Sequence, residues 1–320
     1  MRVLITGVSG FAGSHLAEHC LEQGDEVWGT CHAGAKIANV ASILDRLTIR
    51  VGDISDGGFL RGVLSEARFG ALFHLAALTF VPEVEQAPRR AYEVNMMGGF
   101  QLLQAALEVQ PQVRVILVSS AEVYGRVPPE GLPVKESQPF APVNALAAAK
   151  AALEMAAQPF VHTHGLHVVV ARPFNHTGPR QRPEFVCSSL ALQVARFEAR
   201  QETTIRVGDV SSKRDFSDVR DVVRAYRLLA LHGQKGEAYN LASGQSVSIQ
   251  RVLELLTQMT RVKAGILVET ERVRPGEVSD AYGSYEKINR CAGWRPQIPL
   301  EKTLRDLLNW HRDQLLRREG

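Results

Sequence analysis

The sequence predicts an α/β fold in which a doubly wound parallel sheet is followed by a smaller, mostly C-terminal α/β lobe. Two observations support this prediction. Short apolar runs alternate with amphipathic stretches as far as about residue 171, a pattern typical of a parallel sheet covered by helices. The first of these runs leads into the spacing G-x-x-G-x-x-G at Gly7, Gly10 and Gly13.

The N-terminal unit predicts a dinucleotide site. The strand-like run Val3–Ile5 is followed by the glycine turn, a helical pattern that ends at Gly24, and a second strand at Val27–Thr30. This order within about thirty residues is the dinucleotide-binding βαβ unit of a Rossmann domain. Its glycines let the backbone turn sharply and approach a pyrophosphate, which the amide groups of the helix N-terminus bind.

The later segments continue the alternation of strands and helices and then depart from it. We expect further strands at Leu47–Val51, Ala71–His74, Val113–Ser119 and His167–Ala171, with long helices at Pro88–Glu108 and Val143–His164. Beyond them the alternation is irregular, with helices at Glu184–Gln201, Asp218–His232 and from Leu300, and a short strand at Thr204–Val207. We therefore assign residues 1–172 and about 216–243 to the dinucleotide-binding domain, and about 173–215 and 244–320 to a substrate lobe.

The composition excludes several classes of protein. The 320 residues are 45% hydrophobic and carry a formal net charge of +3, without a basic stripe interleaved with aromatic residues. The four cysteines are scattered, and no histidine pair has a carboxylate at metal-ligand spacing. No apolar run approaches the length of a membrane span. We expect a cytoplasmic protein with no metal, no membrane segment and no nucleic-acid partner.

The cofactor type depends on the end of the second strand. NAD enzymes place Asp or Glu there to bind the ribose 2′-hydroxyl, whereas this chain has Cys31 followed by His32. At this position no carboxylate is present to repel a 2′-phosphate, and no arginine is present to bind one. We therefore expect use of NADP or NAD with a slight preference for NADP. Asp53, after the third strand, either reaches the adenosine side of the cofactor or caps the helix that begins near Asp56.

Several distant motifs resemble one family. They are Gly7/Gly10/Gly13, Gly52-Asp53, His74–Ala77, Asn95, Ser120 with Val123-Tyr124-Gly125, Lys150, Arg172–Asn175, Arg214-Asp215-Phe216 and Arg274–Val278. In this order they resemble the extended short-chain dehydrogenases/reductases that act on nucleotide sugars. Phe174–Gln181 and Arg214–Asp221 are similar to the branch that reduces GDP-4-keto-6-deoxy-mannose, with GDP-mannose 4,6-dehydratases as neighbours.

The resemblance implies residue roles. Ser120 would bond the 4-oxygen of the sugar, Lys150 would hold the nicotinamide ribose, and Glu122 would be the base that dehydratases use at carbon 5. Arg214 and Arg274 would clamp the diphosphate. The implied cofactor-binding residues are Gly7, Gly10, Phe11, Gly13, Cys31, His32, Asp53, Ile54, Leu75, Ala76, Ala77, Asn95 and Lys150. The implied substrate-binding residues are Thr79, Ser120, Glu122, Asn175, Phe185, Val186, Arg214, Arg274 and Glu277.

One position departs from the family pattern. Members carry Tyr-x-x-x-Lys at the start of the helix that holds Lys150, but the tyrosine position is Leu146. Leucine cannot donate a proton, and loss of a positioned general acid typically costs about 10²–10⁴ in rate.

Three explanations of Leu146 stay open. The protein turns over slowly or only binds its ligands; or another acid replaces the tyrosine; or this alanine-rich stretch has been altered from its natural sequence. The candidate replacement acids are Ser120, Glu122, Tyr124, His176 and water.

The sequence thus leads to one main function and two alternatives. The main expectation is an NAD(P)-dependent reductase at carbon 4 of a GDP-linked 4-keto-6-deoxyhexose, impaired by Leu146. The alternatives are a 4,6-dehydratase or epimerase of nucleotide sugars, and a catalytically silent nucleotide-sugar-binding protein. The resemblance also implies a homodimer that pairs the two long helices of each subunit in a four-helix bundle.

Overall fold

A seven-stranded sheet lies at the centre of the molecule. The computed structural model describes residues 1–260, 265–268 and 280–319. The strands follow the order β11-β6-β5-β4-β1-β2-β3, and all neighbouring pairs are parallel. They are β1 (Arg2–Thr6), β2 (Glu26–Cys31), β3 (Leu47–Val51), β4 (Ala71–His74), β5 (Arg114–Val118), β6 (His167–Pro173) and β11 (Ala238–Leu241). The predicted α/β class with a doubly wound parallel sheet is confirmed.

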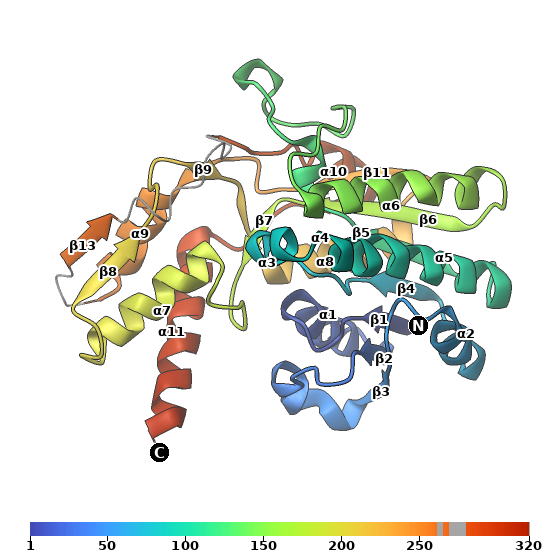
Figure 1. The fold of residues 1–320 in the computed structure, drawn as a ribbon, viewed down its shortest axis with the longest axis horizontal. Helices are drawn as coiled ribbons and strands as arrows, with labels where there is room; N and C mark the ends of the chain where they lie inside the picture. Colours follow the sequence, from blue (N-terminus) through green and yellow to red (C-terminus); the bar gives the residue numbers. More distant parts are fainter. Residues whose placement is uncertain (261–264, 269–279, 320) are drawn as a thin grey trace.

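Helices cover both faces of this sheet, and each face has its own apolar core. One face carries α1 (Phe11–Glu22), the 3-10 helix η1 (Ala38–Arg46), α8 (Val219–His232) and α10 (Glu286–Ala292). The other carries α2 (Gly57–Glu66), α5 (Gly98–Val109) and α6 (Ala145–His162), and α5 lies beside α6 (Figure 1). Val3 and Ile5 point into the first core and Leu4 into the second, as the two-residue period of a strand requires.

Short polar side chains fix where several helices begin. Asp56 caps α2 by accepting from the backbone N–H groups of Gly58 and Phe59. Asn144 caps α6 in the same way, through the N–H of Ala147. Such caps satisfy donors that the first helical turn leaves without partners.

The long helix expected over Pro88–Glu108 is interrupted. After α3 (Val81–Gln86), the chain forms α4 (Pro88–Tyr92), a π-helical turn η2 (Glu93–Met97) and then α5. The apolar spacing of the sequence gave no sign of the π turn. The turn changes which side chains face inward, since Asn95 is fully buried whereas Met97 is 38% exposed. π turns inside helices are often found at functional sites, and this one holds Asn95.

A third apolar core lies away from the sheet, on the left in Figure 1. It joins α7 (Val186–Glu198), β8 (Thr204–Val207), α9 (Ile249–Gln258) and α11 (Leu300–Glu319). Three short strand pairs accompany it: β7 (Asn175–Thr177) with β10 (Phe216–Asp218), β9 (Lys213–Arg214) with β12 (Val247–Ser248), and β8 with β13 (Gly265–Val268). The domain boundaries drawn from the sequence stay a prediction.

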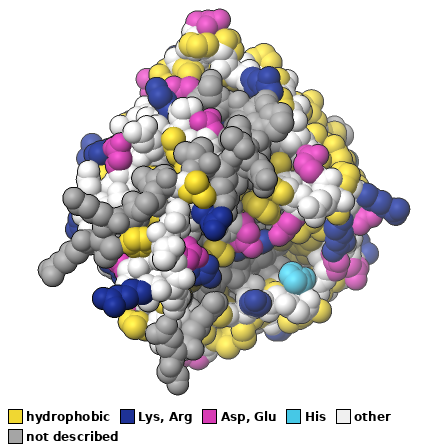
Figure 2. Space-filling model, turned by 60° about the vertical axis from the view of Figure 1, so that its left-hand side comes forward, with side chains coloured by type: hydrophobic (Ala, Val, Ile, Leu, Met, Phe, Trp, Pro, Cys, Tyr) yellow, Lys and Arg dark blue, Asp and Glu magenta, His cyan; other side chains and the backbone are white. Residues whose placement is uncertain are grey.

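In the described residues, each helix is either too short or too polar to cross a lipid bilayer. On the face drawn in Figure 2, acidic, basic and apolar side chains are interspersed around the grey atoms.

Candidate active site

The glycine turn between β1 and α1 is built for a close backbone approach. Gly7 has φ +72°, and a Cβ there would lie 3.0 Å from the backbone N of Ala76. A Cβ on Gly13 would lie 2.2 Å from the carbonyl oxygen of Gly7. The first turn of α1 carries no acidic side chain, so the helix itself places no negative side chain against an anion at its N-terminus. These residues fit the pyrophosphate of a dinucleotide.

Thr6 joins the ends of β1 and β4, where the strand order of the sheet reverses. Its Oγ1 accepts from the N–H groups of Leu75 and Ala76, both at 3.1 Å, and lies 3.0 Å from Nδ1 of His74. The hydroxyl hydrogen therefore points to His74 Nδ1, which acts as the acceptor. His74 is fully buried, and burial lowers its pKa to about 3, so its ring is neutral. The hydrogen bonds of Thr6 fix Leu75–Ala77 beside Gly7, at the reversal of strand order where open α/β sheets bind ligands.

Asn95 holds the segment that follows β4. Its Oδ1 accepts from the N–H of Leu78 at 2.7 Å, and its Nδ2 donates to the carbonyl of Leu78 at 2.8 Å. Both ends of this buried amide are used in shaping the segment after β4. Thr79, the next residue, is exposed.

The expected adenosine side contains an exposed histidine and a tethered aspartate. Cys31 ends β2 and is buried, which raises the pKa of its thiol, whereas His32 is exposed. Asp53 Oδ1 accepts from the N–H and Oγ of Ser55 at 2.9 and 2.7 Å, and Oδ2 lies 3.2 Å from Nη2 of Arg90. These bonds hold the pKa of Asp53 below its usual range. The capping alternative for Asp53 is wrong, because Asp56 caps α2.

Ile54 and Phe11 are the remaining apolar residues expected at the cofactor. Ile54 is buried beneath Gly98 at the start of α5, where a Cβ would lie 2.8 Å from Ile54 Cγ2. Phe11, at the start of α1, stacks on the ring of His176 with centroids 5.9 Å apart. His176 thus lies against the helix that follows the glycine turn, and its Nδ1 is 3.1 Å from the carbonyl of Phe174.

The expected catalytic groups gather where β5 ends and α6 begins. Ser120 caps η3 (Ala121–Tyr124), since its Oγ accepts from the N–H of Glu122 at 3.1 Å. The exposed carboxylate of Glu122 accepts from Nδ2 of Asn144 at 2.7 Å. Lys150 Nζ donates to the carbonyl of Val118 at 2.7 Å. Burial lowers the pKa of Lys150 to about 8, while the nearby carboxylate of Glu154 acts in the opposite direction.

Leu146 lies one helical turn before Lys150 on the same face of α6. Its side chain is 5% exposed and packs in a small apolar cluster with Val84 and Ala91. The position that would carry a tyrosine hydroxyl is therefore filled by hydrocarbon.

Tyr124 does not supply the missing acid. Its hydroxyl donates to Oδ1 of Asn240 at 2.6 Å and accepts from Nη1 of Arg172 at 2.9 Å. The side chain is 1% exposed, and burial raises its pKa to about 12. The suggestion that Tyr124 replaces the family tyrosine is wrong, because this hydroxyl is committed to an interior network.

That network was missed in the sequence. Arg172 on β6 forms a buried ion pair with Glu154 on α6, with Nη2 and Oε2 2.7 Å apart, and Glu154 also accepts from Oγ of Ser119. Glu154 follows Lys150 by four residues as Lys150 follows Leu146, so a helix places all three on one face. The spacing was visible, but Glu154 resembled an ordinary surface glutamate until its partner on a distant strand was known.

The substrate-side residues are only partly brought together. Asn175 begins β7 and is exposed, and Val186 begins α7 with 38% exposure. Phe185 packs edge-to-face on Phe80, with centroids 5.8 Å apart. Arg214 on β9 is half-buried and donates from Nη1 to the carbonyl of Lys213 at 2.8 Å. Arg274 and Glu277 lie outside the described residues.

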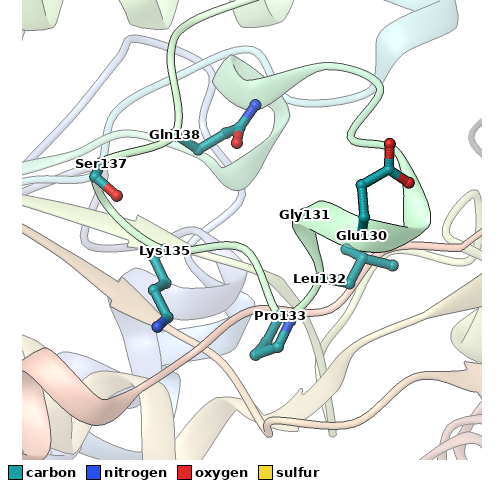
Figure 3. Close-up of a pocket in the computed structure, with 7 residues that line it drawn as sticks. All are labelled: Glu130, Gly131, Leu132, Pro133, Lys135, Ser137 and Gln138. Atoms are coloured by element: carbon teal, nitrogen blue, oxygen red, sulfur yellow. The ribbon is translucent and has the colours of Figure 1, made fainter.

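A pocket of about 340 Å³ lies in the connection between β5 and α6 (Figure 3). It is lined by Glu130, Gly131, Leu132, Pro133, Lys135, Ser137 and Gln138. None of these is a site residue expected from the sequence.

The family model described as GDP-mannose 4,6 dehydratase matches residues 4–307. The chain belongs to this family. It is 35% identical to the GDP-6-deoxy-D-mannose reductase of Pseudomonas aeruginosa, over 96% of each protein. It is 31% identical to a UDP-glucose 4-epimerase of Halalkalibacterium halodurans, over 98% of this chain and 96% of that protein. The predicted relationship to nucleotide-sugar reductases and dehydratases is confirmed.

Two solved structures of family relatives show the same fold. The RMD protein of Pseudomonas aeruginosa, complexed with NADPH, is 32% identical with a TM-score of 0.85, over 98% of this chain and 99% of that one. The UDP-glucose 4-epimerase of Thermotoga maritima, with UDP-glucose, is 27% identical with a TM-score of 0.88, over 98% and 100%.

Proposed function

We propose that this protein is an NAD(P)H-dependent reductase of a GDP-linked 4-keto-6-deoxyhexose that works slowly because it lacks a tyrosine acid. The observation that carries this proposal is the contrast at the end of β5. Beyond an intact glycine turn, Ser120 and Lys150 lie at the junction of β5 and α6, while apolar Leu146 fills the position at which the resemblance implies a tyrosine. Relatives that reduce or dehydrate GDP sugars support the substrate class.

Each residue contributes to binding or orientation. The α1 N-terminus holds the dinucleotide pyrophosphate, Lys150 holds the ribose beside the nicotinamide, and Ser120 orients the sugar 4-oxygen. When bound, the dinucleotide supplies a hydride equivalent for carbon 4. The resulting alkoxide needs a proton. With leucine at position 146, that proton comes from the hydroxyl of Ser120 or from a water molecule beside Glu122. Neither has a pKa matched to the task, so the step is slow.

The proposed cofactor preference is weak and favours NADP(H). No carboxylate ends β2, and exposed His32 lies next to buried Cys31, so a 2′-phosphate meets no opposing charge there. One exposed contact between His32 and the 2′-phosphate contributes about 1 kcal/mol. We expect NADPH to bind about fivefold more tightly than NADH by fluorescence titration. A preference for NADH would show that another group reads the ribose.

Cofactor binding should weaken at alkaline pH. Lys150 is charged below its pKa of about 8 and neutral above it, and its charge attracts the cofactor phosphates. If the bound dinucleotide raises this pKa by one unit, affinity falls up to about tenfold between about pH 7 and about pH 10. The measurement is the NADPH dissociation constant against pH. Lys150→Arg keeps its charge throughout and should flatten this profile; an unchanged profile in that variant would assign the effect elsewhere.

A dehydratase is the second candidate, favoured by the exposed carboxylate of Glu122 at the end of β5. A dehydratase regenerates its cofactor within each cycle and keeps it bound. Mass spectrometry of the released ligands after purification separates the two: retained oxidised dinucleotide, with GDP-mannose converted to a 4-keto product, would replace the reductase proposal.

We also propose a homodimer formed by α5 and α6 of two subunits. Met155 on α6 is 61% exposed and Met97, just before α5, is 38% exposed. Half-buried Ala152 and Ala156 lie on α6 near Met155, and small residues allow a second helix to approach closely. Light scattering should give twice the monomer mass, and Met155→Glu should shift it toward the monomer mass.

A further inference from the structure

Arg180 lies between the glycine turn expected to bind the cofactor and the loop expected to bind the substrate. Its backbone conformation is unusual. Its φ is +74°, a conformation that favours glycine over residues with a Cβ. The side chain is nonetheless only 16% exposed, and both of its terminal nitrogens form hydrogen bonds. A residue with a Cβ in this conformation carries backbone strain, which the contacts of the Arg180 guanidinium offset.

The guanidinium contacts three residues beside the glycine turn. Nη1 donates to the carbonyl of Asn39 on η1 at 2.9 Å, and Nη2 donates to His15 Nδ1 at 3.2 Å and to the carboxylate of Glu18 on α1. Asn39 in turn donates from Nδ2 to the carbonyl of Ser9, within the glycine turn, at 3.0 Å. Two consecutive hydrogen bonds thus connect Arg180 to the turn expected to hold the pyrophosphate.

His15 fixes the backbone of the same segment. Its Nε2 lies 2.9 Å from the carbonyl of Pro179, which can only accept, so Nε2 carries the hydrogen. Nδ1 is then the acceptor that Arg180 requires. Both hydrogen bonds of His15 are satisfied by one neutral tautomer, which carries its hydrogen on Nε2. Burial, which lowers the pKa of His15 to about 4, agrees with this state.

The segment held in this way also carries the substrate side. Asn175 lies five residues before Arg180, and Phe185 lies five residues after it. His176 stacks on Phe11 of α1. The clamp, defined as Arg180, His15, Glu18 and Asn39, therefore connects the cofactor turn with the loop between β7 and α7.

We propose that Arg180 is a positioning residue that couples the two ligands, so that a bound dinucleotide tightens binding of the nucleoside diphosphate and the reverse. The inference rests on the proposed binding of both ligands but not on turnover. Coupling of this kind is reciprocal. The mechanism is local: a dinucleotide that orders the turn at Ser9 also orders Asn39, Arg180 and the substrate loop.

The test measures binding of NADPH and GDP by calorimetry, each alone and each with the other saturating. In the unmodified protein, NADPH should tighten GDP binding about fivefold or more. Arg180→Gly keeps the backbone conformation accessible and removes the clamp, so the coupling factor should fall to about one. Asn39→Ala, which leaves the loop itself intact, should do the same, and combining the two should add nothing.

Arg182→Ala is the matched control. Arg182 lies on the same loop and pairs with exposed Glu83 and Glu184 rather than with α1, so its removal should leave the coupling unchanged. Unaltered coupling in Arg180→Gly, an equal loss in Arg182→Ala, or no coupling in the unmodified protein would overturn the proposal. Because no turnover is read, failure of the reductase proposal and failure of the clamp are distinguishable.

Discussion

Leu146→Tyr is expected to raise the turnover of a GDP-linked 4-keto-6-deoxyhexose with NADPH by about 10²–10⁴. The substitution places a phenol on the face of α6 that holds Lys150, one helical turn away. The charged ammonium of Lys150 lowers the pKa of a neighbouring phenol, which makes it a better proton donor. The measurement is the initial rate of NADPH oxidation at saturating substrate.

Leu146→Phe is the matched control, because it adds the same ring without the hydroxyl. Leu146 is 5% exposed against Val84 and Ala91, so either ring must displace apolar neighbours, and any effect of repacking appears in both variants. A gain confined to the tyrosine variant assigns the missing function to the hydroxyl. Equal rates in the unmodified protein and the tyrosine variant would mean that another group already supplies the proton.

Glu154→Ala is expected to lower the free energy of unfolding by about 3–5 kcal/mol. Glu154 and Arg172 are 5% and 8% exposed, and Arg172 donates to Glu154 from Nε and Nη2. Among the residues that the structure describes, removing the carboxylate leaves the buried guanidinium with the Tyr124 hydroxyl and the Glu136 carbonyl as acceptors. For a chain of this length, that loss lowers Tm by about 5 °C or more, measured by circular dichroism.

Two comparisons make this prediction specific. Glu108→Ala removes one side of the exposed Arg61–Glu108 pair, whose charged atoms are 3.5 Å apart, and should cost under about 1 kcal/mol. The double variant Glu154→Leu/Arg172→Met should recover much of the loss, because it removes both buried charges together. If Glu154→Ala melts like Glu108→Ala, the interior pair contributes little to stability.

The sheet and the glycine turn could be predicted because their signals are local. The strand runs and the spacing of Gly7, Gly10 and Gly13 each lie within a few residues, and the structure places them as expected. The π turn at Asn95 could not be predicted, since its signal is one inserted residue in an otherwise regular apolar pattern. Its consequence, two hydrogen bonds to Leu78, depends on a contact across the chain.

The site was less predictable where tertiary partners decide a residue's role. Tyr124 looked like an available acid next to Ser120, but its partners Arg172 and Asn240 come from distant strands. Arg180 lay within a motif that pointed only to substrate, and its contacts with α1 and η1 arise only in the folded chain. Leu146 is the opposite case. Its chemistry is plain from the sequence alone, and the structure adds only that it is buried among apolar side chains.

The central claim is that both ligands bind while proton transfer is slow. The most direct measurement is a single turnover, in which the unmodified protein loaded with NADPH is mixed with a saturating GDP-4-keto-6-deoxyhexose and NADPH oxidation is followed. We predict a rate that saturates with substrate and reaches a plateau at least about 10²-fold below the median enzyme turnover of about 10 s⁻¹. A saturating rate near that median, or no saturation because the sugar nucleotide does not bind, would contradict the account.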